Sequence, residues 1–307
     1  MGLFRSKDQY QGYNIYSMKK YVDKKRIIFN MIVAIITIIT LIFVVYYIVD
    51  TSLRLKRTKK YEAQIIEYQK EQEEIKKQKE AERQAKIPKL TNEGKENLKN
   101  IYHSENKRAF LTFDDGPSQN TNDILNILKN NNIKATFFVL GSQVEVFPET
   151  TNRIYNEGHY IANHGYSHKY STIYQSPEQI LNEYNQCNQI VASTIKVPEY
   201  NSHLFRFPGG FVGGKYAKIK ADSLPLLEQN NILYVDWNSL TGDSEKVNPT
   251  EEYLMDNLQK TTQAKNSLVI LMHDSQAKRV TVDFLPKVIE YLTQQGYEFD
   301  NFYSVIK

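Results

Sequence analysis

The sequence predicts an α/β domain built on a parallel sheet, either open or closed into a barrel, preceded by a membrane-spanning helix and a charged helical stalk. From Arg108 onward, short apolar runs rich in β-forming residues alternate with amphipathic helical stretches. The prominent polar residues come just after successive apolar runs, as expected for a site at the carboxyl ends of parallel strands. One long apolar run near the start of the chain predicts the membrane segment.

Length, charge and cysteine content limit what the protein can be. A chain of 307 residues allows one large domain with accessory segments, or two domains. Most of the excess Lys and Arg behind the net charge of +4 lies in the first hundred residues, so no nucleic-acid partner is expected. The one cysteine, Cys187, excludes an intrachain disulfide and a cysteine-rich zinc site. Its helical spacing from Tyr184 and Val191 predicts a core residue.

Residues 27–49 predict a single membrane-spanning helix. At 1.5 Å per residue this apolar run covers about 34 Å, which is enough to cross a bilayer. No small-residue cleavage site follows it, which argues against a signal peptide. Basic residues flank both of its ends, so the positive-inside rule barely sets the orientation. We expect a cytoplasmic basic tail over 1–26 and an extracellular C-terminal domain.

A charged stretch over 50–87 predicts a solvated helical spacer of about 50 Å. It contains no glycine or proline before Pro88. Its apolar seam lasts barely two heptads, so a coiled coil is weakly supported. A linker over 88–107 follows, with a short helix near 92–102 capped by Thr91. We assign residues 108–307 to the α/β domain, which carries the candidate functional residues.

The strand and helix ranges follow from the alternation. Strands are expected over 109–113, 136–140, 159–162, 203–207, 232–237 and 268–272, with a weaker strand near 298–303. Helices are expected near 121–131, 148–157, 177–194, 223–230, 249–260 and 283–295. Ser176-Pro177 signals the start of one helix, and Asn248-Pro249-Thr250-Glu251 resembles a capping box for another.

Two acids and two histidines at the expected strand ends predict a metal site. Asp114 and Asp115 follow the first strand, and two adjacent carboxylates there need a cation or donor nearby. His164 and His168 lie four residues apart after the third strand, and two imidazoles with one carboxylate form a common divalent-metal set. The second carboxylate can then act as a general base. Read alone, these pairs are also compatible with an Asp-capped turn and with surface histidines.

Further polar residues follow later strands. Arg206 would hold Asp114 ionised if the two were close, although a surface arginine is the simpler interpretation of that residue alone. His273 ends a buried strand and can protonate a leaving group, or it can be a hydrogen-bonded structural residue. Asp243 comes shortly after the strand that ends at Trp237. Three histidines are expected to be structural or on the surface: His103, His159 and His203.

Four motifs, in this order, resemble the polysaccharide deacetylases (NodB homology domain, carbohydrate esterase family 4). They are Thr112-Phe-Asp-Asp-Gly116, His164-x-x-x-His168, Arg206-x-Pro-x-Gly210 and Leu271-x-His273. The resemblance covers roughly residues 105–307. It implies a distorted (β/α) barrel and metal-dependent removal of acetyl groups from N-acetylated sugars, as in membrane-anchored peptidoglycan N-acetylglucosamine deacetylases.

The resemblance also implies a role for each matched residue. The metal ligands would be Asp115, His164 and His168. Asp114 would be the base, tethered by Arg206, and His273 the acid, oriented and charged by Asp243. The Gly209 amide would help hold the oxyanion, and Leu271 would border the acetyl methyl. Asp243-Ser244 stands where the family often has Asp-Trp, so another residue such as the upstream Trp237 is needed for that pocket wall, and Gly165 stands where Ser or Thr is usual.

One divalent ion is implied, with zinc expected first and cobalt, nickel or manganese as possible occupants of such a site. The expected partners are a cell-wall glycan substrate and, through the single span, the membrane; the oligomeric state is left open. Two alternatives share the fold: an O-acetyl esterase of the xylan type and a chitooligosaccharide deacetylase. A third alternative is a catalytically inactive protein that binds wall glycan.

Overall fold

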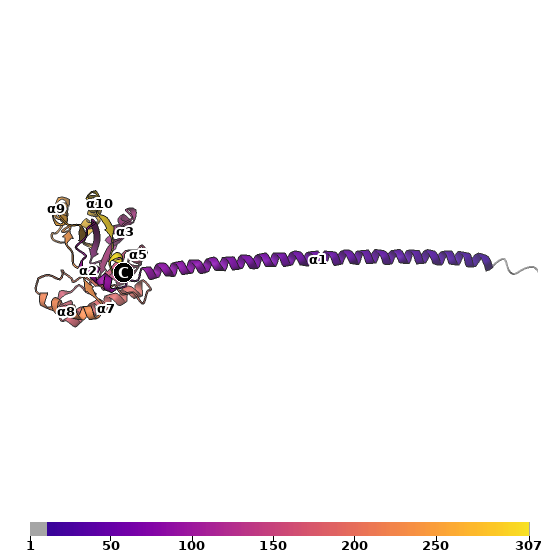
Figure 1. Cartoon of the computed structure of the whole chain (residues 1–307), viewed down its shortest axis with the longest axis horizontal. Helices are drawn as coiled ribbons and strands as arrows, with labels where there is room; N and C mark the ends of the chain where they lie inside the picture. Colours follow the sequence, from indigo (N-terminus) through magenta and orange to yellow (C-terminus); the bar gives the residue numbers. More distant parts are fainter. Residues whose placement is uncertain (1–10, 307) are drawn as a thin grey trace, which may run out of the picture. The chain divides into compact units, whose positions relative to one another are not determined.

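The computed structural model describes residues 11–306 and contains two compact units, Met1–Lys79 and Glu80–Lys307. The first ten residues of the predicted cytoplasmic tail lie outside the described residues. Each unit is considered by itself below, and Figure 1 labels the elements of both.

A single helix, α1 (Gln11–Ala85), runs through both the predicted span and the predicted spacer. No glycine or proline interrupts the chain between Gly12 and Pro88, so the helix has no local reason to stop. Its most apolar window has a mean hydropathy of 2.9, and none of that window is buried against protein. The hydroxyls of Thr37 and Thr40 donate to carbonyls one turn back in the same helix. These features make α1 a candidate membrane span.

The second unit contains a parallel sheet ordered β5-β4-β3-β2-β1-β7-β6, with β8 paired to the first half of β1. The strands are β1 Arg108–Asp114, β2 Thr136–Val139, β3 Tyr160–Asn163, β4 Leu204–Phe205, β5 Leu233–Tyr234, β6 Ser239–Leu240, β7 Ser267–His273 and β8 Glu298–Asp300. Among the described residues, β5 and β6 form no pairing with each other. The sheet therefore curls into an incomplete parallel barrel.

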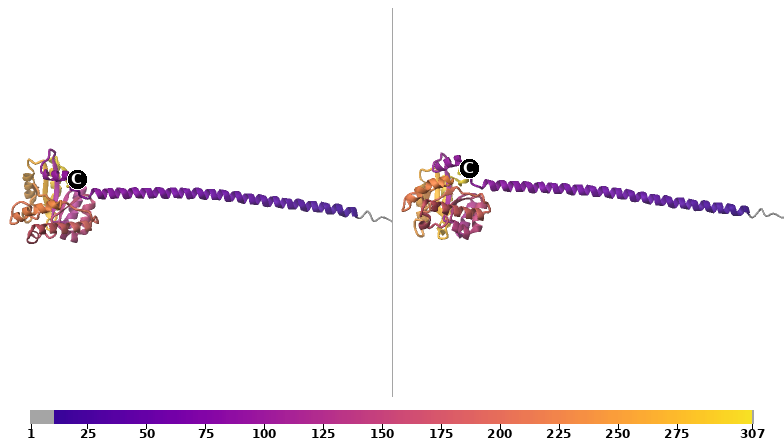
Figure 2. Two further views of the ribbon diagram at one scale, coloured as in Figure 1. Left: turned by 60° about the horizontal axis from the view of Figure 1, so that its bottom comes forward. Right: turned by 90° about the horizontal axis from the view of Figure 1, so that it is seen from below.

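Helices cover the outside of the sheet (Figure 2). The helices are α2 Asn92–Lys99, α3 Gln119–Asn130, α4 Gly141–Val146, α5 Pro148–Asn156, α6 Tyr170–Ile173, α7 Pro177–Thr194, α8 Ala217–Gln229, α9 Glu251–Thr262, α10 Arg279–Gln294 and α11 Tyr303–Ile306. Helix α10 lies between α3 and α9, and α7 packs on α8 (Figure 1). Helix α11, at the C-terminus, packs on α2.

The structure differs from the predicted elements where local signals are weak. The sequence did not predict β6, α4, α6 and α11, which are too short to show a period. Helices α8 and α10 begin several residues earlier than predicted, and no side chain caps either start. Helix α9 is capped by Thr250, which accepts a hydrogen bond from the Tyr253 amide, and not by Asn248. By contrast, Thr91 and Ser176 cap their helices as predicted.

Alternation along the two central strands separates the core from the barrel interior. In β1, Leu111 and Phe113 belong to the outer core beneath the helices, whereas Phe110 belongs to the inner cluster. Because side chains alternate between faces, Asp114 lies on the inner face with Phe110. In β7, the same argument places Leu271 and His273 on the inner face. The inner cluster also includes apolar residues of α2 and α11.

Candidate active site and metal centre

Strand register brings together residues that are far apart in the sequence. The pairing of β1 with β7 places Asp114 directly opposite His273. The pairing of β3 with β4 matches Asn163 with Phe205, so the next residues, His164 and Arg206, also become neighbours. The Nδ1 atom of His164 lies 2.7 Å from the Arg206 carbonyl oxygen. All of these residues lie at the carboxyl ends of their strands, where α/β barrels build their active sites.

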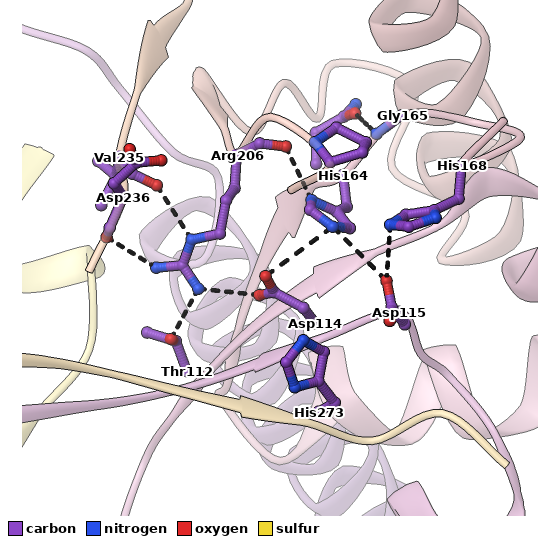
Figure 3. Close-up of polar contacts among 12 residues, drawn as sticks. Thr112, Asp114, Asp115, His164, Gly165, His168, Arg206, Val235, Asp236 and His273 are labelled. Carbon is purple, nitrogen blue, oxygen red and sulfur yellow. Dashed lines mark hydrogen bonds and ion pairs between the residues drawn. The ribbon is translucent and has the colours of Figure 1, made fainter. Parts of the chain in front are cut away.

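Arg206 is fully buried and holds Asp114 (Figure 3). Its Nη1 atom donates to Asp114 Oδ1 and to Thr112 Oγ1, each at 2.8 Å. Its other nitrogens donate to the carbonyl oxygens of Val235 and Asp236, each at 3.0 Å. The guanidinium also lies 3.9 Å from the Phe138 ring centroid. The guanidinium is fixed by four hydrogen bonds and holds Asp114 Oδ1 in one orientation, so the Asp114 side chain has little freedom.

Asp115, His164 and His168 bring their ligand atoms together. The Oδ1 atom of Asp115 lies 3.5 Å from His164 Nε2 and 3.3 Å from His168 Nε2, and one ligand atom from each residue lies within 4.8 Å of the others. Two ligands bound at about 2.1 Å to one tetrahedral ion lie about 3.4 Å apart. Asp115 Oδ1 is buried, and no hydrogen-bond partner for it is found among the described residues. These donor atoms therefore fit one divalent cation.

The environment of His164 suits a neutral metal ligand. Burial lowers the pKa of its imidazole, and the nearby Asp114 and Asp115 only partly oppose that effect. A neutral ring donates from Nδ1 to the Arg206 carbonyl and leaves the Nε2 lone pair facing Asp115. Figure 3 shows Asp114 between Arg206 and His164, and the carboxylate of Asp115 facing both His164 and His168.

Two of the three candidate ligands have left-handed backbone. Asp115 has φ of 74° and His168 has φ of 55°. Non-glycine residues seldom adopt this conformation, and such residues cluster at active sites and ligand clamps. Gly165 has a φ of 86°. Glycine adopts this backbone conformation freely, whereas Ser or Thr would adopt it only with strain. At both Asp115 and His168 the backbone thus departs from regular strand or helix geometry.

His273 and Asp243 form a second coupled pair. His273 Nδ1 lies 2.9 Å from Asp243 Oδ1, while the His273 amide and the Thr281 hydroxyl donate to Asp243 Oδ2. Burial by itself lowers the pKa of His273, but the hydrogen bond and the charge of Asp243 outweigh it and raise the pKa to about 9. Burial likewise opposes ionisation of Asp243, yet its bonds from His273 and Thr281 lower its pKa. The imidazolium form of His273 is thereby favoured.

One cavity of about 360 Å³ collects these groups. All but one of the predicted site residues line it: Asp114, Asp115, His164, His168, Gly209, Trp237, Asp243, Leu271 and His273. Arg206 does not line it, because the guanidinium lies buried against Asp114. Trp237 is present in the cavity wall, whereas Ser244 is exposed at its edge. The aromatic side chain of the cavity wall is thus supplied by Trp237 and not by the position of Ser244, where the family pattern has tryptophan.

The sequence did not predict several neighbours of the site. Tyr170 lines the cavity, and a Cβ at Gly209 would lie 2.5 Å from its hydroxyl. The only sequence feature that could have pointed to Tyr170 was its position two residues after His168. Asp274 lies fully buried directly after His273, and burial raises its pKa to about 7 against a hydrogen bond from Thr121. The sequence signal that could have identified Asp274 was an acidic residue directly after an apolar strand and His273.

The residues expected to be structural agree with their surroundings. Cys187 is fully buried, and burial raises the pKa of its thiol. His159 is fully buried and its Nδ1 accepts a hydrogen bond from the Ala135 amide. His203 Nδ1 lies 2.9 Å from the Asn231 carbonyl. His103 is exposed. None of these residues lines the active-site cavity.

An incomplete parallel barrel with acidic and imidazole side chains at its strand ends defines an α/β-barrel enzyme. The family model for polysaccharide deacetylase matches residues 102–224. The chain is 31% identical to a peptidoglycan-N-acetylglucosamine deacetylase of Bacillus cereus over 65% of this chain and 71% of that protein. The chain therefore belongs to the polysaccharide deacetylase family, and the predicted enzyme class is confirmed.

Solved structures agree with the family assignment. The catalytic domain of a peptidoglycan N-acetylglucosamine deacetylase from Eubacterium rectale matches with a TM-score of 0.59 at 30% identity, covering 65% of this chain and 90% of that one. A CE4 esterase from Streptococcus mutans matches with a TM-score of 0.61 at 27% identity, covering 69% and 92%. The predicted distorted (β/α) barrel is therefore confirmed.

Proposed function

We propose that this polysaccharide deacetylase is a metal-dependent enzyme that removes N-acetyl groups from N-acetylglucosamine residues of peptidoglycan. The observation that carries the proposal is the single cavity in which a candidate metal triad, a tethered carboxylate and an imidazole–carboxylate pair meet. The names of the relatives support peptidoglycan as the substrate. We keep zinc as the expected ion, with cobalt, nickel and manganese as alternatives.

Asp115, His164 and His168 would hold the ion. A divalent ion bound there supplies Lewis acidity, which polarises an acetamide carbonyl and lowers the pKa of water. Asp114 is placed to act as the base. Its Oδ1 is occupied by Arg206, while its Oδ2 lies 3.8 Å from His164 Nε2 and faces the triad. That oxygen can take the proton from an attacking water molecule.

His273 is placed to act as the acid. Because Asp243 occupies Nδ1, the Nε2 of His273 is left for the substrate, and the raised pKa of the imidazole favours the form that has a proton to give. Transfer of that proton to the amide nitrogen allows the amine to leave as the C–N bond breaks. The Gly209 amide would donate a hydrogen bond to the developing oxyanion. Leu271 and Trp237 provide apolar wall for the acetyl methyl.

The test measures acetate release by the full chain in detergent micelles. We expect release from peptidoglycan fragments, loss of release after chelation, and recovery when zinc is returned. Acetylated xylan and chitin oligomers, offered at equal acetyl concentration, separate the proposal from the esterase and chitooligosaccharide alternatives. If no acetate appears from peptidoglycan with any of the four ions, the proposal is wrong. Glycan binding that survives chelation, without turnover, would instead favour a binding protein.

We further propose that α1 anchors the enzyme in the cell membrane, with the catalytic domain outside the cell. The support is the apolar window of α1, which has no protein surface to cover it, and a cell-wall substrate that lies outside the membrane. Fractionation of cells and protease treatment of intact protoplasts test this placement. We expect the chain in the membrane fraction and the catalytic domain to be digested from outside. Secretion of a shortened chain would show that the segment is a cleaved signal sequence.

A further inference from the structure

Glu183 is a buried acid that has no part in the mechanism above. It lies on α7 and is 3% exposed. Its neighbours along the buried face of the helix are Ile180, Tyr184 and Cys187. Among the described residues, no ion pair involves Glu183. A buried carboxylate without a cation is costly unless several hydrogen bonds stabilise it, so its bonding partners indicate what it does.

The hydrogen bonds that Glu183 accepts come from a single loop. Its Oε2 accepts from the backbone amides of Tyr166 and Ser167, at 2.8 Å and 2.7 Å. Its Oε1 accepts from the Ser167 hydroxyl at 2.8 Å. Tyr166 and Ser167 lie between His164 and His168, the two imidazoles of the candidate metal site. The Glu183 carboxylate therefore binds the middle of the loop that connects the two candidate metal ligands, His164 and His168.

Other contacts fix the opposite side of the same loop. The Asn163 side chain accepts from the Gly165 amide at 2.9 Å. The amides of Gly141 and Ser142 donate to the carbonyls of Gly165 and Tyr166, at 3.0 Å and 3.1 Å. The loop thus has its carbonyls bound by the start of α4 and its amides bound by Glu183. His168 has a φ of 55°, which residues other than glycine seldom adopt without support from their surroundings.

We infer that Glu183 is a positioning residue that holds the Gly165–Ser167 backbone so that His164 and His168 present their Nε2 atoms to one divalent cation. The inference rests on the proposed metal site and goes beyond it by naming the support of the loop. Hydrogen-bonded partners behind metal ligands orient those ligands, and their removal commonly weakens metal binding by about 10- to 100-fold. Glu183 acts on the peptide backbone between the ligands and not on an imidazole ring.

The experiment is zinc titration calorimetry on the metal-free full chain in detergent micelles. Glu183→Ala removes the acceptor, and we expect zinc binding about 10- to 100-fold weaker than in the unmodified chain. Glu183→Gln keeps an oxygen for the two amides and an NH₂ group for the serine hydroxyl, so we expect affinity within about threefold. Gln186→Ala, on the exposed part of α7, is the matched control and should bind as the unmodified chain does.

Ser167→Ala serves as a second variant if Glu183→Ala does not fold. It removes one hydrogen bond to Glu183 and keeps the two backbone bonds, so its zinc affinity should lie between those of the unmodified chain and Glu183→Ala. Circular dichroism reports folding, and amide exchange at Tyr166 and Ser167 should speed up in Glu183→Ala. Unchanged zinc affinity in Glu183→Ala, or in Ser167→Ala where the first does not fold, overturns the inference.

Three results overturn the inference in different ways. Equal weakening in Glu183→Gln and Glu183→Ala would show that charge, and not the positioning of the loop, supports metal binding. Absence of zinc binding in the unmodified chain would overturn the inference together with the proposed function. Normal zinc binding in the unmodified chain with no effect of the variants would overturn the inference alone.

Discussion

Strand β3 has a fully buried histidine just before it and an almost fully buried one just after it, and the two behave in opposite ways. His159, before the strand, is buried beside the cations Lys134 and Arg153; burial first, and then those charges, lower its pKa to about 3. His164, after the strand, is buried beside the carboxylates Asp114 and Asp115, which partly oppose the effect of burial on its pKa. Burial is nearly the same in both cases, but the balance of charge differs. One carboxylate, Glu157, lies 4.0 Å from His159 Nε2, and the two cations still lower the pKa of His159 further, whereas two carboxylates oppose the effect of burial at His164.

The difference shows which feature makes a buried imidazole useful. Among the described residues, His159 Nε2 has no hydrogen-bond partner. Glu157 Oε2 lies 4.0 Å from it, but among the described residues His159 belongs to no cluster of three potential metal ligands. His164 Nε2 faces the oxygen of Asp115, which also has no hydrogen-bond partner and completes a set of donors. This contrast supports our proposal that the carboxyl end of β3 is functional and its amino end structural, as the barrel architecture leads one to expect.

The largest expected effect is at the carboxyl end of the sheet. Asp114→Asn keeps the shape of the side chain and removes the base, so kcat for acetate release should fall about 10²- to 10⁴-fold. The measurement is single-substrate kinetics on peptidoglycan fragments with saturating zinc. Asp123→Asn, at a partly exposed aspartate on α3 that pairs with Arg279 and does not line the cavity, is the control and should keep full activity. Full activity in Asp114→Asn would remove that residue from the mechanism.

Exchanging the two histidines tests the comparison directly. His164→Asn deletes one ligand, so zinc affinity measured by calorimetry should fall by at least about 100-fold, beyond the usual effect of a supporting residue. His159→Asn should leave zinc affinity unchanged, because that ring lies outside the cavity. Comparable losses of affinity in both variants would show that the carboxyl end is not distinct from the amino end.

The pair formed by His273 and Asp243 predicts a shift in pH dependence. Loss of the acid form limits activity as pH rises past the pKa of His273, which is about 9. Asp243→Asn removes the anion that raises this pKa, so the alkaline limb of kcat/KM should move to lower pH. Thr281→Val removes one hydrogen bond to Asp243 and keeps its charge, so it should shift the limb less. An unmoved limb in Asp243→Asn would assign it to another group.

The smallest expected effect is on acid stability and comes from the amino end of β3. The folded state holds His159 neutral down to a pKa of about 3, whereas the unfolded state takes up a proton below about 6.5. The contribution of His159 to stability is therefore lost as pH falls through 6.5, by about 2 kcal/mol at pH 5. The raised pKa values of His273 and Asp274 change stability in the opposite direction over this range, so the contribution must be read from a comparison of variants. Urea unfolding at pH 8 and pH 5 gives the change in stability of each protein, and relative to the unmodified chain His159→Asn should lose less stability at pH 5. The exposed His103→Asn should not; equal losses in all three proteins would contradict the assignment.

The sequence could predict much of the site because its motifs are local. Asp114, Asp115, His164 and His168 occur in short segments with fixed spacing, and each segment follows an apolar run. The sequence could not predict Glu183 as part of the site, although a charged residue on the buried stripe of α7 was a signal. Tyr170 gave no signal, because its place beside Gly209 depends on how two separate loops meet.

The boundaries of helices and strands show the same difference between features set by local sequence and features set by tertiary contacts. Thr91, Ser176 and Pro177 mark helix starts because their effect on the backbone is local. The two-residue strands β4 to β6 have no period of their own, and pairing with neighbouring strands defines them. The unbroken α1 similarly follows from the absence of glycine and proline, so sequence alone is enough to account for it.

By itself, the sequence determined the apolar segment of α1, the alternation of strands and helices, and the types of side chain available for chemistry. These depend on interactions between residues close together in the chain. The tertiary structure alone decided which groups meet: Asp114 with Arg206, His273 with Asp243, and Asp115 with two imidazoles. The physical reason is that strand register and loop contacts set those distances, and both depend on pairings between segments far apart in the chain.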